Sequence, residues 1–415
     1  MNKEERQLLC CLRAYRTGEA AAEIIESLSP EEWRRLYELS AAHKLTAVVF
    51  EMLHGREDFC SGDPALAGRW KRDAILQAVA QTGRTQKLLE LTAALDGAGV
   101  RYALVKGAIC RQLYHKGDLR PSGDEDLFIP PSERQYCGEV FARHGLRAVS
   151  PQEEADVAHW HDPATGLHLE LHTRQFSTGW TAERILNPYF EQQLEHTVTA
   201  AVEHTAVQTL QPTAHLLFLI AHTLKHFITG GFGVRTLSDL LSYCERYQEQ
   251  IDHRTLWDML ERIRGAVFFR QLLQIGQLYL DFDAAPWGGI PSDPSDGNAL
   301  LDDMLAAGIY GQTSMDRRHS GALALQTAQG RRTAPSLRGA LFPPASQLKG
   351  RYPILRKAPV LLPVMWLHRM GHYGLELLRA NGTENSPWTT LSQGKQRTEM
   401  MVKYGILPQA KTEDR

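Results

Sequence analysis

The segment 101–129, RYALVKGAICRQLYHKGDLRPSGDEDLFI, limits most strongly what this chain can fold into. It combines a short apolar strand, a Lys-Gly turn, a helical pattern, a polar loop and a second strand that carries two aspartates. Side chains alternate between the two faces of a strand. We therefore expect Asp124 and Asp126 to project from one face of a sheet, and Glu125 from the opposite face.

Two carboxylates on one strand face repel each other, so a sheet gains no stability from that arrangement. A divalent metal makes it favourable, because hard cations bind carboxylate and phosphate oxygens together. A third acid, Glu170, lies in the alternating segment 168–172, HLELH. We expect Asp124, Asp126 and Glu170 to bind metal for phosphoryl transfer. Since the pair is repulsive, Asp124→Asn or Asp126→Asn is expected to keep the fold and to raise the melting temperature when metal is absent.

The order Gly107, Asp124-x-Asp126, Glu170 resembles that of the nucleotidyltransferase superfamily, which includes DNA polymerase beta. More narrowly, LVKGAICRQLY, LRPSGDEDLFI and LHLELH are similar to a bacterial group known mainly as uncharacterised nucleotidyltransferase-family proteins, and the likeness extends to about residue 285. The resemblance implies an α+β fold, with a small mixed-sheet, polymerase beta-like core flanked by N-terminal and C-terminal helical regions. It also implies two metal-binding aspartates and a third acid that binds or activates the acceptor.

The turn departs from the superfamily pattern, because Ala108 stands where a serine usually follows the glycine. The phosphate contacts expected here are therefore the backbone of Gly107, the N-terminus of the following helix, and Lys106. Lys106 and Arg120 are also expected to neutralise charge on a leaving pyrophosphate. Glu125 replaces a residue that is more often aliphatic in this group, so it must lie at a sheet edge or be paired.

The pattern along the chain predicts four regions. Ser29-Pro30-Glu31-Glu32 is a strong helix start, and a long amphipathic helix is expected from about Pro64 to Leu95. The regions are an N-terminal helical region (1–98), a nucleotidyltransferase α/β core (99–204), a helical domain (205–290) and a loop-rich C-terminal extension (291–415) with one apolar helix (358–378). We expect that helix to pack against the body, and the polar segment 381–415 to be a partly disordered tail.

Histidines gather around Glu170 in the predicted core. The turn 162–166, DPATG, lies between two alternating segments and predicts a β-hairpin. His159, His161 and His168 therefore cluster near Glu170. A zinc site could be built from such a set, but strand alternation beside a wet cleft explains the histidines as well. His172, on the same face as Glu170, is the best candidate for a substrate contact or for orienting Glu170.

A second group of histidines lies in the apolar segment 214–227, AHLLFLIAHTLKHF, which reads as a buried helix. His222 and His226 are four residues apart and share a face. We expect His222, Lys225 or His226 to face a nucleotide cleft, so that the helical domain forms one of its walls. Core histidines and a metal site are the alternatives. In the next helix, Arg235 and Asp239 could form an ion pair, or Arg235 could reach the triphosphate.

Composition and charge limit which binding partners and which cellular compartment we expect for this chain. The formal net charge is −2, so no global field attracts the chain to nucleic acid or to an anionic membrane. The N-terminus MNKEERQLLCC lacks the apolar run of a signal peptide, and no stretch is apolar for long enough to span a bilayer. The six cysteines lack Cys-x-x-Cys spacing, which suits reduced thiols. The expected location is the cytoplasm.

These features predict a metal-dependent nucleotidyltransferase that moves a nucleotidyl group from an NTP, with ATP as the expected nucleotide, to an acceptor hydroxyl or phosphate. The expected cofactor is Mg²⁺, as two ions bound by Asp124, Asp126 and Glu170, with Mn²⁺ as an alternative. Two other functions stay open. The same site could move a γ-phosphoryl group, as a kinase does, or the chain could be a catalytically silent nucleotide-binding module. The sequence does not identify the acceptor.

Overall fold

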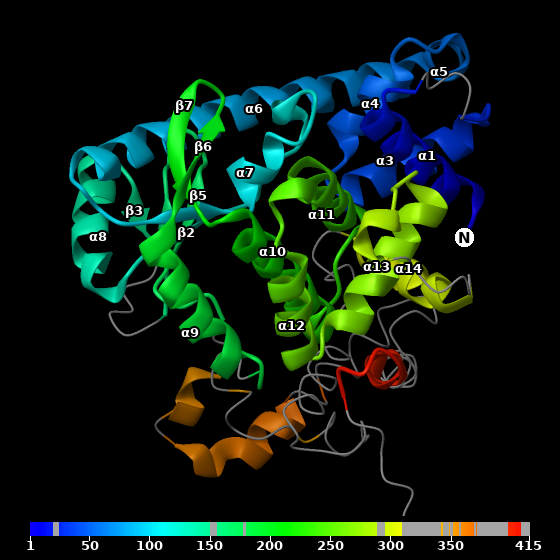
Figure 1. Cartoon of the computed structure of the whole chain (residues 1–415). Helices are drawn as coiled ribbons and strands as arrows, with labels where there is room; N and C mark the ends of the chain where they lie inside the picture. Colours follow the sequence, from blue (N-terminus) through cyan, green and yellow to red (C-terminus); the bar gives the residue numbers. More distant parts are fainter. Residues whose placement is uncertain are drawn as a thin grey trace, which may run out of the picture.

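The protein is described here from a computed structural model, which describes residues 1–19, 25–149, 156–176, 180–288 and 295–308. It also describes short pieces of the C-terminal part, including 352–356, 358–368 and 397–407. Helices surround one small mixed sheet, and a long helix runs beside both the sheet and the N-terminal helices (Figure 1). The fold is therefore α+β, as the sequence predicted.

The N-terminal helices form where the sequence signals place them. The Ser29 hydroxyl accepts a hydrogen bond from the Glu32 N–H, and the Glu32 carboxylate accepts one from the Ser29 N–H, which closes a capping box at the start of α3. The long helix α6 begins after Asp63, whose side chain caps the Leu66 N–H. The helices of this region are α1 (Lys3–Thr17), α3 (Pro30–Ala42), α4 (Thr46–Leu53), α5 (Glu57–Gly62) and α6 (Pro64–Gly97).

The central sheet has five strands in the order β1-β2-β5-β4-β3. Strands β2 and β5 are parallel, and the other neighbouring pairs are antiparallel. The parallel register places Asp126 beside Glu170. The strands are β1 (Ala103–Val105), β2 (Glu125–Phe128), β3 (Arg147–Ala148), β4 (Val157–His161) and β5 (His168–His172), with α7 (Gly107–Arg111) and α8 (Arg134–Arg143) between them.

The hairpin predicted around residues 162–166 is confirmed as β4–β5, with His159 opposite Glu170. A second hairpin, which the sequence analysis did not predict, precedes the helical part of the chain. Its strands β6 (Val198–Val202) and β7 (Thr205–Thr209) pair with each other, and the Thr209 hydroxyl donates to the Leu104 carbonyl at 2.7 Å. The region expected to be helical from residue 205 thus begins with a strand.

Helices follow this hairpin and lie beside the sheet (Figure 1). Helix α10 is apolar nearly all round and buries most of its side chains, as its sequence indicated. It contacts α11 and α12. The helices of this part are α9 (Glu183–Gln193), which precedes the hairpin, and α10 (Pro212–Thr229), α11 (Val234–Tyr247), α12 (His253–Arg262), α13 (Ala266–Tyr279) and α14 (Ser295–Ala307).

The C-terminal segment contains a buried piece within the region expected to be a partly disordered tail. Residues 397–403 are helical, and Met401 and Tyr404 are buried. The Arg397 guanidinium donates to the carbonyls of Phe227 and Gly230 at the end of α10. The described part of 397–407 therefore packs on the helical body, which the polar composition of the segment did not indicate.

The apolar helix expected at 358–378 lies partly outside the described residues. Its described part is helical at 362–368. Val360, Val364 and Leu367 are 83%, 53% and 66% exposed, so these side chains do not make the expected packing against the body. Among the described helices, none is both long and apolar enough to cross a membrane.

Candidate active site

The turn between β1 and α7 holds Lys106 in an unusual backbone conformation. Its φ is +61° and its ψ is −109°, a combination that side-chain-bearing residues rarely adopt. The Lys106 N–H donates to Nε2 of His215 at 3.0 Å, and the Thr209 hydroxyl lies 3.4 Å from Nδ1 of the same ring. Since Nε2 accepts, His215 is the neutral tautomer with its proton on Nδ1. The buried histidine of α10 thus fixes the turn that presents the lysine.

Glu125 occupies the space over this turn. Its carboxylate accepts a hydrogen bond from the Ala108 N–H at 2.8 Å and forms an ion pair with Arg111. A Cβ at position 107 would collide with the same carboxylate, so only glycine fits. From the sequence, we expected a phosphate to bind at the Gly107 backbone and the N-terminus of the following helix. The structure instead places the Glu125 carboxylate at the N-terminus of α7, so Gly107 serves the close packing of this turn. The predicted pairing of Glu125 is confirmed.

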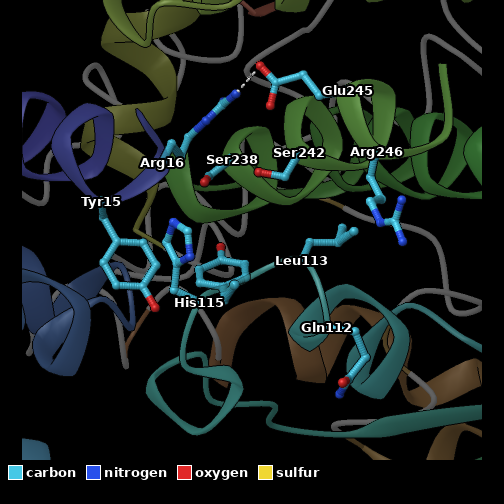
Figure 2. A pocket seen from close by; sticks show the side chains of 10 residues that line it. Tyr15, Arg16, Gln112, Leu113, His115, Ser238, Ser242, Glu245 and Arg246 are labelled. Atoms are coloured by element: carbon cyan, nitrogen blue, oxygen red, sulfur yellow. Dashed lines mark hydrogen bonds and ion pairs between the residues drawn. The ribbon is translucent and has the colours of Figure 1, made fainter. Parts of the chain in front are cut away.

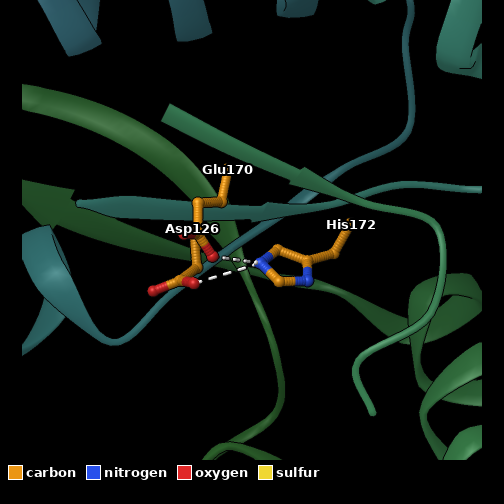
Figure 3. Close-up of side chains that lie close together, drawn as sticks. All are labelled: Asp126, Glu170 and His172. Carbon is orange, nitrogen blue, oxygen red and sulfur yellow. Dashed lines mark hydrogen bonds and ion pairs between the residues drawn. The ribbon is translucent and has the colours of Figure 1, made fainter. Parts of the chain in front are cut away.

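The acidic face of the sheet brings together three side chains from β2 and β5 (Figure 3). His172 Nε2 lies 3.1 Å from Oδ1 of Asp126 and 3.2 Å from Oε2 of Glu170. One atom from each residue lies within 4.8 Å of the others. Asp124 lies just before β2, and its Oδ2 is 3.7 Å from the ammonium of Lys106, which is 2.9 Å from Oδ2 of Asp126.

Two cations, Lys106 and His172, lie among the three carboxylates of Asp124, Asp126 and Glu170. Burial would raise the pKa of Asp126, but Lys106 and His172 outweigh it and hold the pKa well below its usual range. Burial would lower the pKa of His172, but its bonds to Asp126 and Glu170 raise the pKa to about 9. Lys106 lowers the pKa of Asp124, but burial and the nearby carboxylates outweigh it, so the pKa of Asp124 is raised. Without metal, the cations therefore compensate Asp126, whereas repulsion among the carboxylates remains at Asp124.

The donor set suits a divalent metal. Asp126, Glu170 and His172 offer two carboxylates and, once His172 has lost its proton, an imidazole nitrogen. Carboxylates suit Mg²⁺ and Mn²⁺. His172 was expected to contact substrate or orient Glu170. The structure adds it to the residues that could bind metal, a role that its place two residues after Glu170 could have suggested.

Helix α10 faces the acidic side chains across a pocket of about 230 Å³. Lys106, Asp124 and Glu170 line one side, and His222, Lys225 and His226 line the other. The three residues of α10 line this pocket, and their predicted contact with a nucleotide stays a prediction. Nε2 of His226 lies 3.3 Å from Nε2 of His222, so one ring donates to the other. Burial lowers the pKa of both rings, which keeps the pair neutral.

Arg120 joins the sheet to α11. Its guanidinium donates to both carboxylate oxygens of Asp239, at 2.9 and 2.6 Å, and Arg120 is only 2% exposed. The Tyr114 hydroxyl donates to the same carboxylate at 2.8 Å. An ion pair of Asp239 with Arg235 was one of two alternatives considered, the other being contact of Arg235 with the triphosphate; in the structure Arg235 donates to the Pro121 carbonyl. The direct partner is Arg120, more than a hundred residues away along the chain. Arg120 lines the pocket, but its charge is already engaged.

Buried histidines make the stability of the fold depend on pH. Burial lowers the pKa of His43 to about 4 and those of His215 and His226 to about 3. In an unfolded chain each ring would titrate near 6.5. The neutral rings therefore contribute stability that is fully present above pH 6.5 and is lost as the pH falls towards 3. In this range, each neutral ring loses about 1.4 kcal/mol of its stabilising contribution per unit fall in pH. His172 behaves in the opposite way, losing its contribution between pH 6.5 and 9.

We expect the free energy of unfolding, measured by denaturant titration in chelator, to be highest near pH 6.5 and to fall on both sides. His43→Gln is the matched variant, because Gln does not titrate and its longer side chain keeps an N–H donor for the Leu305 carbonyl, 3.2 Å from His43 Nε2. Below pH 6.5, the free energy of unfolding of this variant should fall less steeply than that of the unmodified chain, by about 1.4 kcal/mol per pH unit, because one titrating ring is gone. Equal stability at pH 7 and pH 5, or an unchanged slope in the variant, would show that these rings are not held neutral.

The α+β fold thus places carboxylates from the adjacent strands β2 and β5 near a lysine of α10. The model of a family described as "Uncharacterised nucleotidyltransferase" matches residues 29–281, which is well over half of the chain. This chain therefore belongs to that family.

Two other comparisons add less. A solved structure described as an antigenic nucleotidyltransferase-like protein from Paracoccidioides brasiliensis is 16% identical, with a TM-score of 0.31. The match covers 50% of this chain and 98% of that one. No curated protein matches this chain.

Proposed function

We propose that this chain is a metal-dependent nucleotidyltransferase that uses an NTP, with ATP as the expected donor, to modify a hydroxyl or phosphate of a cytoplasmic acceptor. The family membership supports the reaction class. The observation that carries the proposal is the cluster of Asp126, Glu170 and His172, with Asp124 beside it. Asp124 and Glu170 line a pocket that also contains Lys106 and Lys225. Carboxylates on one sheet face, with lysine ammonium groups nearby, are suited to holding a triphosphate and its metal together.

Two Mg²⁺ or Mn²⁺ ions, bound by Asp124, Asp126 and Glu170, would neutralise the triphosphate and lower the pKa of the acceptor hydroxyl. His172 holds Glu170 and Asp126 in place through one ring nitrogen. The pocket of about 230 Å³ is smaller than the 300–1,000 Å³ typical of ligand pockets. It would admit the phosphates, while the base and ribose would lie outside it.

The reaction needs a base and cations for the leaving group. Glu170 would accept the proton of the acceptor hydroxyl. The acceptor oxygen would bond to the α-phosphorus as the bond to the bridging oxygen breaks, and pyrophosphate would leave. The flexible Lys106 side chain can move from Asp126 to a phosphate oxygen, and Lys225 lies on the opposite wall. Both ammonium groups would stabilise the leaving charge. We assign Arg120 a positioning role, because Asp239 already binds it.

The reaction class is tested by incubating the full chain with Mg²⁺, ATP labelled at either the α or the γ phosphorus, and a panel of sugar phosphates, polypeptides and hydroxyl-bearing antibiotics. Transfer of the α label with release of pyrophosphate supports the proposal. Transfer of the γ label would make the chain a kinase-like enzyme at the same site. Binding of Mg-ATP without any transfer would favour a silent nucleotide-binding module. Absence of Mg-ATP binding by calorimetry would contradict all three.

Glu170→Gln is expected to separate binding from chemistry. The side chain is on a different strand from the aspartates and is the most plausible base, so the rate of transfer should fall by about 10²–10⁴. Affinity for Mg-ATP should stay within a few-fold. Calorimetry and single-turnover transfer measure the two quantities. If affinity falls as much as the rate, Glu170 acts on the nucleotide. If the rate barely changes, Glu170 only pairs with His159 and His172, 3.4 and 3.2 Å away.

A further inference from the structure

Charge is distributed unevenly along this chain. The segment 317–375, which we call the basic segment, contains no Asp or Glu and ten Lys or Arg residues. Since the formal net charge of the whole chain is −2, a segment of +10 leaves −12 on the rest of the chain. The nearly neutral total therefore combines a strongly basic segment with an acidic remainder, and the basic segment attracts anionic partners locally.

The described part of the basic segment exposes apolar side chains. Val360 belongs to the 3-10 helix η7 (Pro359–Leu361), and the helical residues 362–368 follow it directly. Val360, Val364 and Leu367 are each more than half exposed. Their spacing of four and three residues places them on one side of a helical segment. Figure 1 shows the described pieces of this segment, in orange, at the outer edge of the molecule.

An aromatic pair extends the apolar character of this helical piece. The Trp366 ring lies 5.3 Å from the Phe342 ring, centroid to centroid, at an angle of 80°. Neither side chain is buried, and Phe342 is 38% exposed. Tryptophan is enriched where apolar and aqueous phases meet, because its ring is apolar and its N–H is polar. Two parts of the basic segment thus contribute to one partly exposed apolar surface.

Basic residues flank the exposed apolar residues closely along the chain. Lys357 precedes Val360 by three residues, and Arg369 follows Leu367 by two. Because a chain spans at most about 3.6 Å per residue, the Cα atoms of both basic residues lie within about 11 Å of an exposed apolar residue. Cations are therefore close to the apolar side chains, whichever direction the connecting backbone takes.

This combination identifies the kind of partner. Nucleic acid would neutralise the cations but leave Val360, Val364 and Leu367 in water. An apolar protein surface would cover these side chains and leave the cations unpaired. A bilayer with anionic lipids offers phosphates directly above hydrocarbon and so satisfies both. The helical residues 362–368 are only about 10 Å long, against the roughly 30 Å of a bilayer core. The placement that fits them is along the membrane surface.

We infer that the basic segment attaches this protein to the surface of a membrane that contains anionic lipids. Val360, Val364 and Leu367 enter the boundary between headgroups and acyl chains, and the neighbouring Lys and Arg residues bind lipid phosphates. None of these residues lines the catalytic pocket. The inference therefore does not depend on the proposed transfer reaction.

The test is co-sedimentation of the full chain with vesicles of equal parts phosphatidylcholine and phosphatidylglycerol, and separately with pure phosphatidylcholine vesicles. Binding to the anionic vesicles is expected to be at least about tenfold tighter and to weaken as salt is raised. The triple variant Val360→Ser, Val364→Ser, Leu367→Ser should bind them at least about tenfold more weakly. The double variant Arg356→Gln, Lys357→Gln should lose about as much, because two cations near the surface are removed.

Matched controls change the same residue types elsewhere. The triple variant Ile75→Ser, Leu76→Ser, Val79→Ser removes apolar side chains of α6 that are 51%, 65% and 66% exposed. The double variant Arg246→Gln, Arg254→Gln removes two exposed arginines, the first of which Figure 2 shows on α11. Both controls should bind the anionic vesicles as the unmodified chain does. A circular dichroism melt verifies that every variant is folded.

Four results would overturn the inference. The first is an unmodified chain that does not sediment with the anionic vesicles, and the second is a loss of binding in the controls as large as in the test variants. The third is unchanged vesicle binding by the serine variant of residues 360, 364 and 367, since the cations would then act as a general polyanion site, such as one for RNA. The fourth is a dimer in analytical ultracentrifugation that this variant dissociates, because a second copy would then cover the apolar surface.

Discussion

Replacement of Asp126 by Asn is expected to lower nucleotidyl transfer by about 10³-fold or more. Losing one preorganised electrostatic group typically costs about 10²–10³, and Asp126 would also be lost as a ligand that holds the metal at this site. Transfer of α-labelled phosphate at saturating Mg²⁺ measures the effect. Asp258→Asn, which alters an exposed carboxylate of α12, is the control and should retain full activity. A near-normal rate in Asp126→Asn would refute the metal assignment.

The same substitution is also expected to destabilise the metal-free protein. The sequence-based expectation was the opposite, since two nearby aspartates repel each other. In the structure, Asp126 binds Lys106 at 2.9 Å and His172 at 3.1 Å. Removing its charge leaves both buried cations less compensated, and breaking a buried pair in this way costs about 3–5 kcal/mol. The substitution also relieves repulsion from Asp124 and Glu170, so the expected loss of unfolding free energy is about 3 kcal/mol, the lower end of this range. Denaturant unfolding in chelator measures it.

Removing one member of the Arg120–Asp239 pair should have the largest effect on stability. Asp239→Leu leaves the Arg120 guanidinium buried without its carboxylate, so the free energy of unfolding should fall by about 3–5 kcal/mol. The loop that leads to β2 would also lose its connection to α11, and transfer activity should fall with it. Thermal and denaturant unfolding of the full chain measure the first effect, and labelled transfer measures the second.

The double variant Arg120→Met, Asp239→Leu is the informative companion. With both charges gone, apolar side chains of similar length fill the space, and much of the stability should return. Arg34→Met is the surface control, because its pair with Asp63 involves a 61% exposed arginine and should cost less than about 1 kcal/mol. A single variant as stable as the unmodified chain, or a double variant no better than Asp239→Leu, would show that the pair does not join these elements.

Local signals in the sequence predicted the elements that local chemistry determines. The capping box at Ser29 and the turn 162–166 each contain the groups that form them, so α3 and the β4–β5 hairpin could be predicted. Alternation along 168–172 also placed Glu170 and His172 on one face. By contrast, β6 and β7 were not predicted, since their short segments consist largely of Ala, Thr and Val, with weak alternation and no glycine turn.

Contacts between distant segments could not be predicted from the sequence. Nothing near Arg120 indicates Asp239, and Arg235 seemed the closer partner only because it lies one helical turn away. The compensation of Asp126 by Lys106 depends on the antiparallel pairing of β1 with β2, which brings the turn beside the acids. The helix at 397–403 packs on the end of α10, and no local pattern in either segment indicates this contact.

Binding of Mn²⁺ tests the central claim, the metal site on the acidic sheet face, most directly. Free Mn²⁺ gives an electron paramagnetic resonance signal that disappears on binding, so the signal can be followed as the full chain is added in the absence of nucleotide, which would itself bind Mn²⁺. The expected result is loss of the signal with the unmodified chain and with the control Asp258→Asn, and a signal that stays close to that of free Mn²⁺ with Asp126→Asn. Equal binding by Asp126→Asn, or no binding by the unmodified chain, would contradict the assignment of this cluster as the metal site.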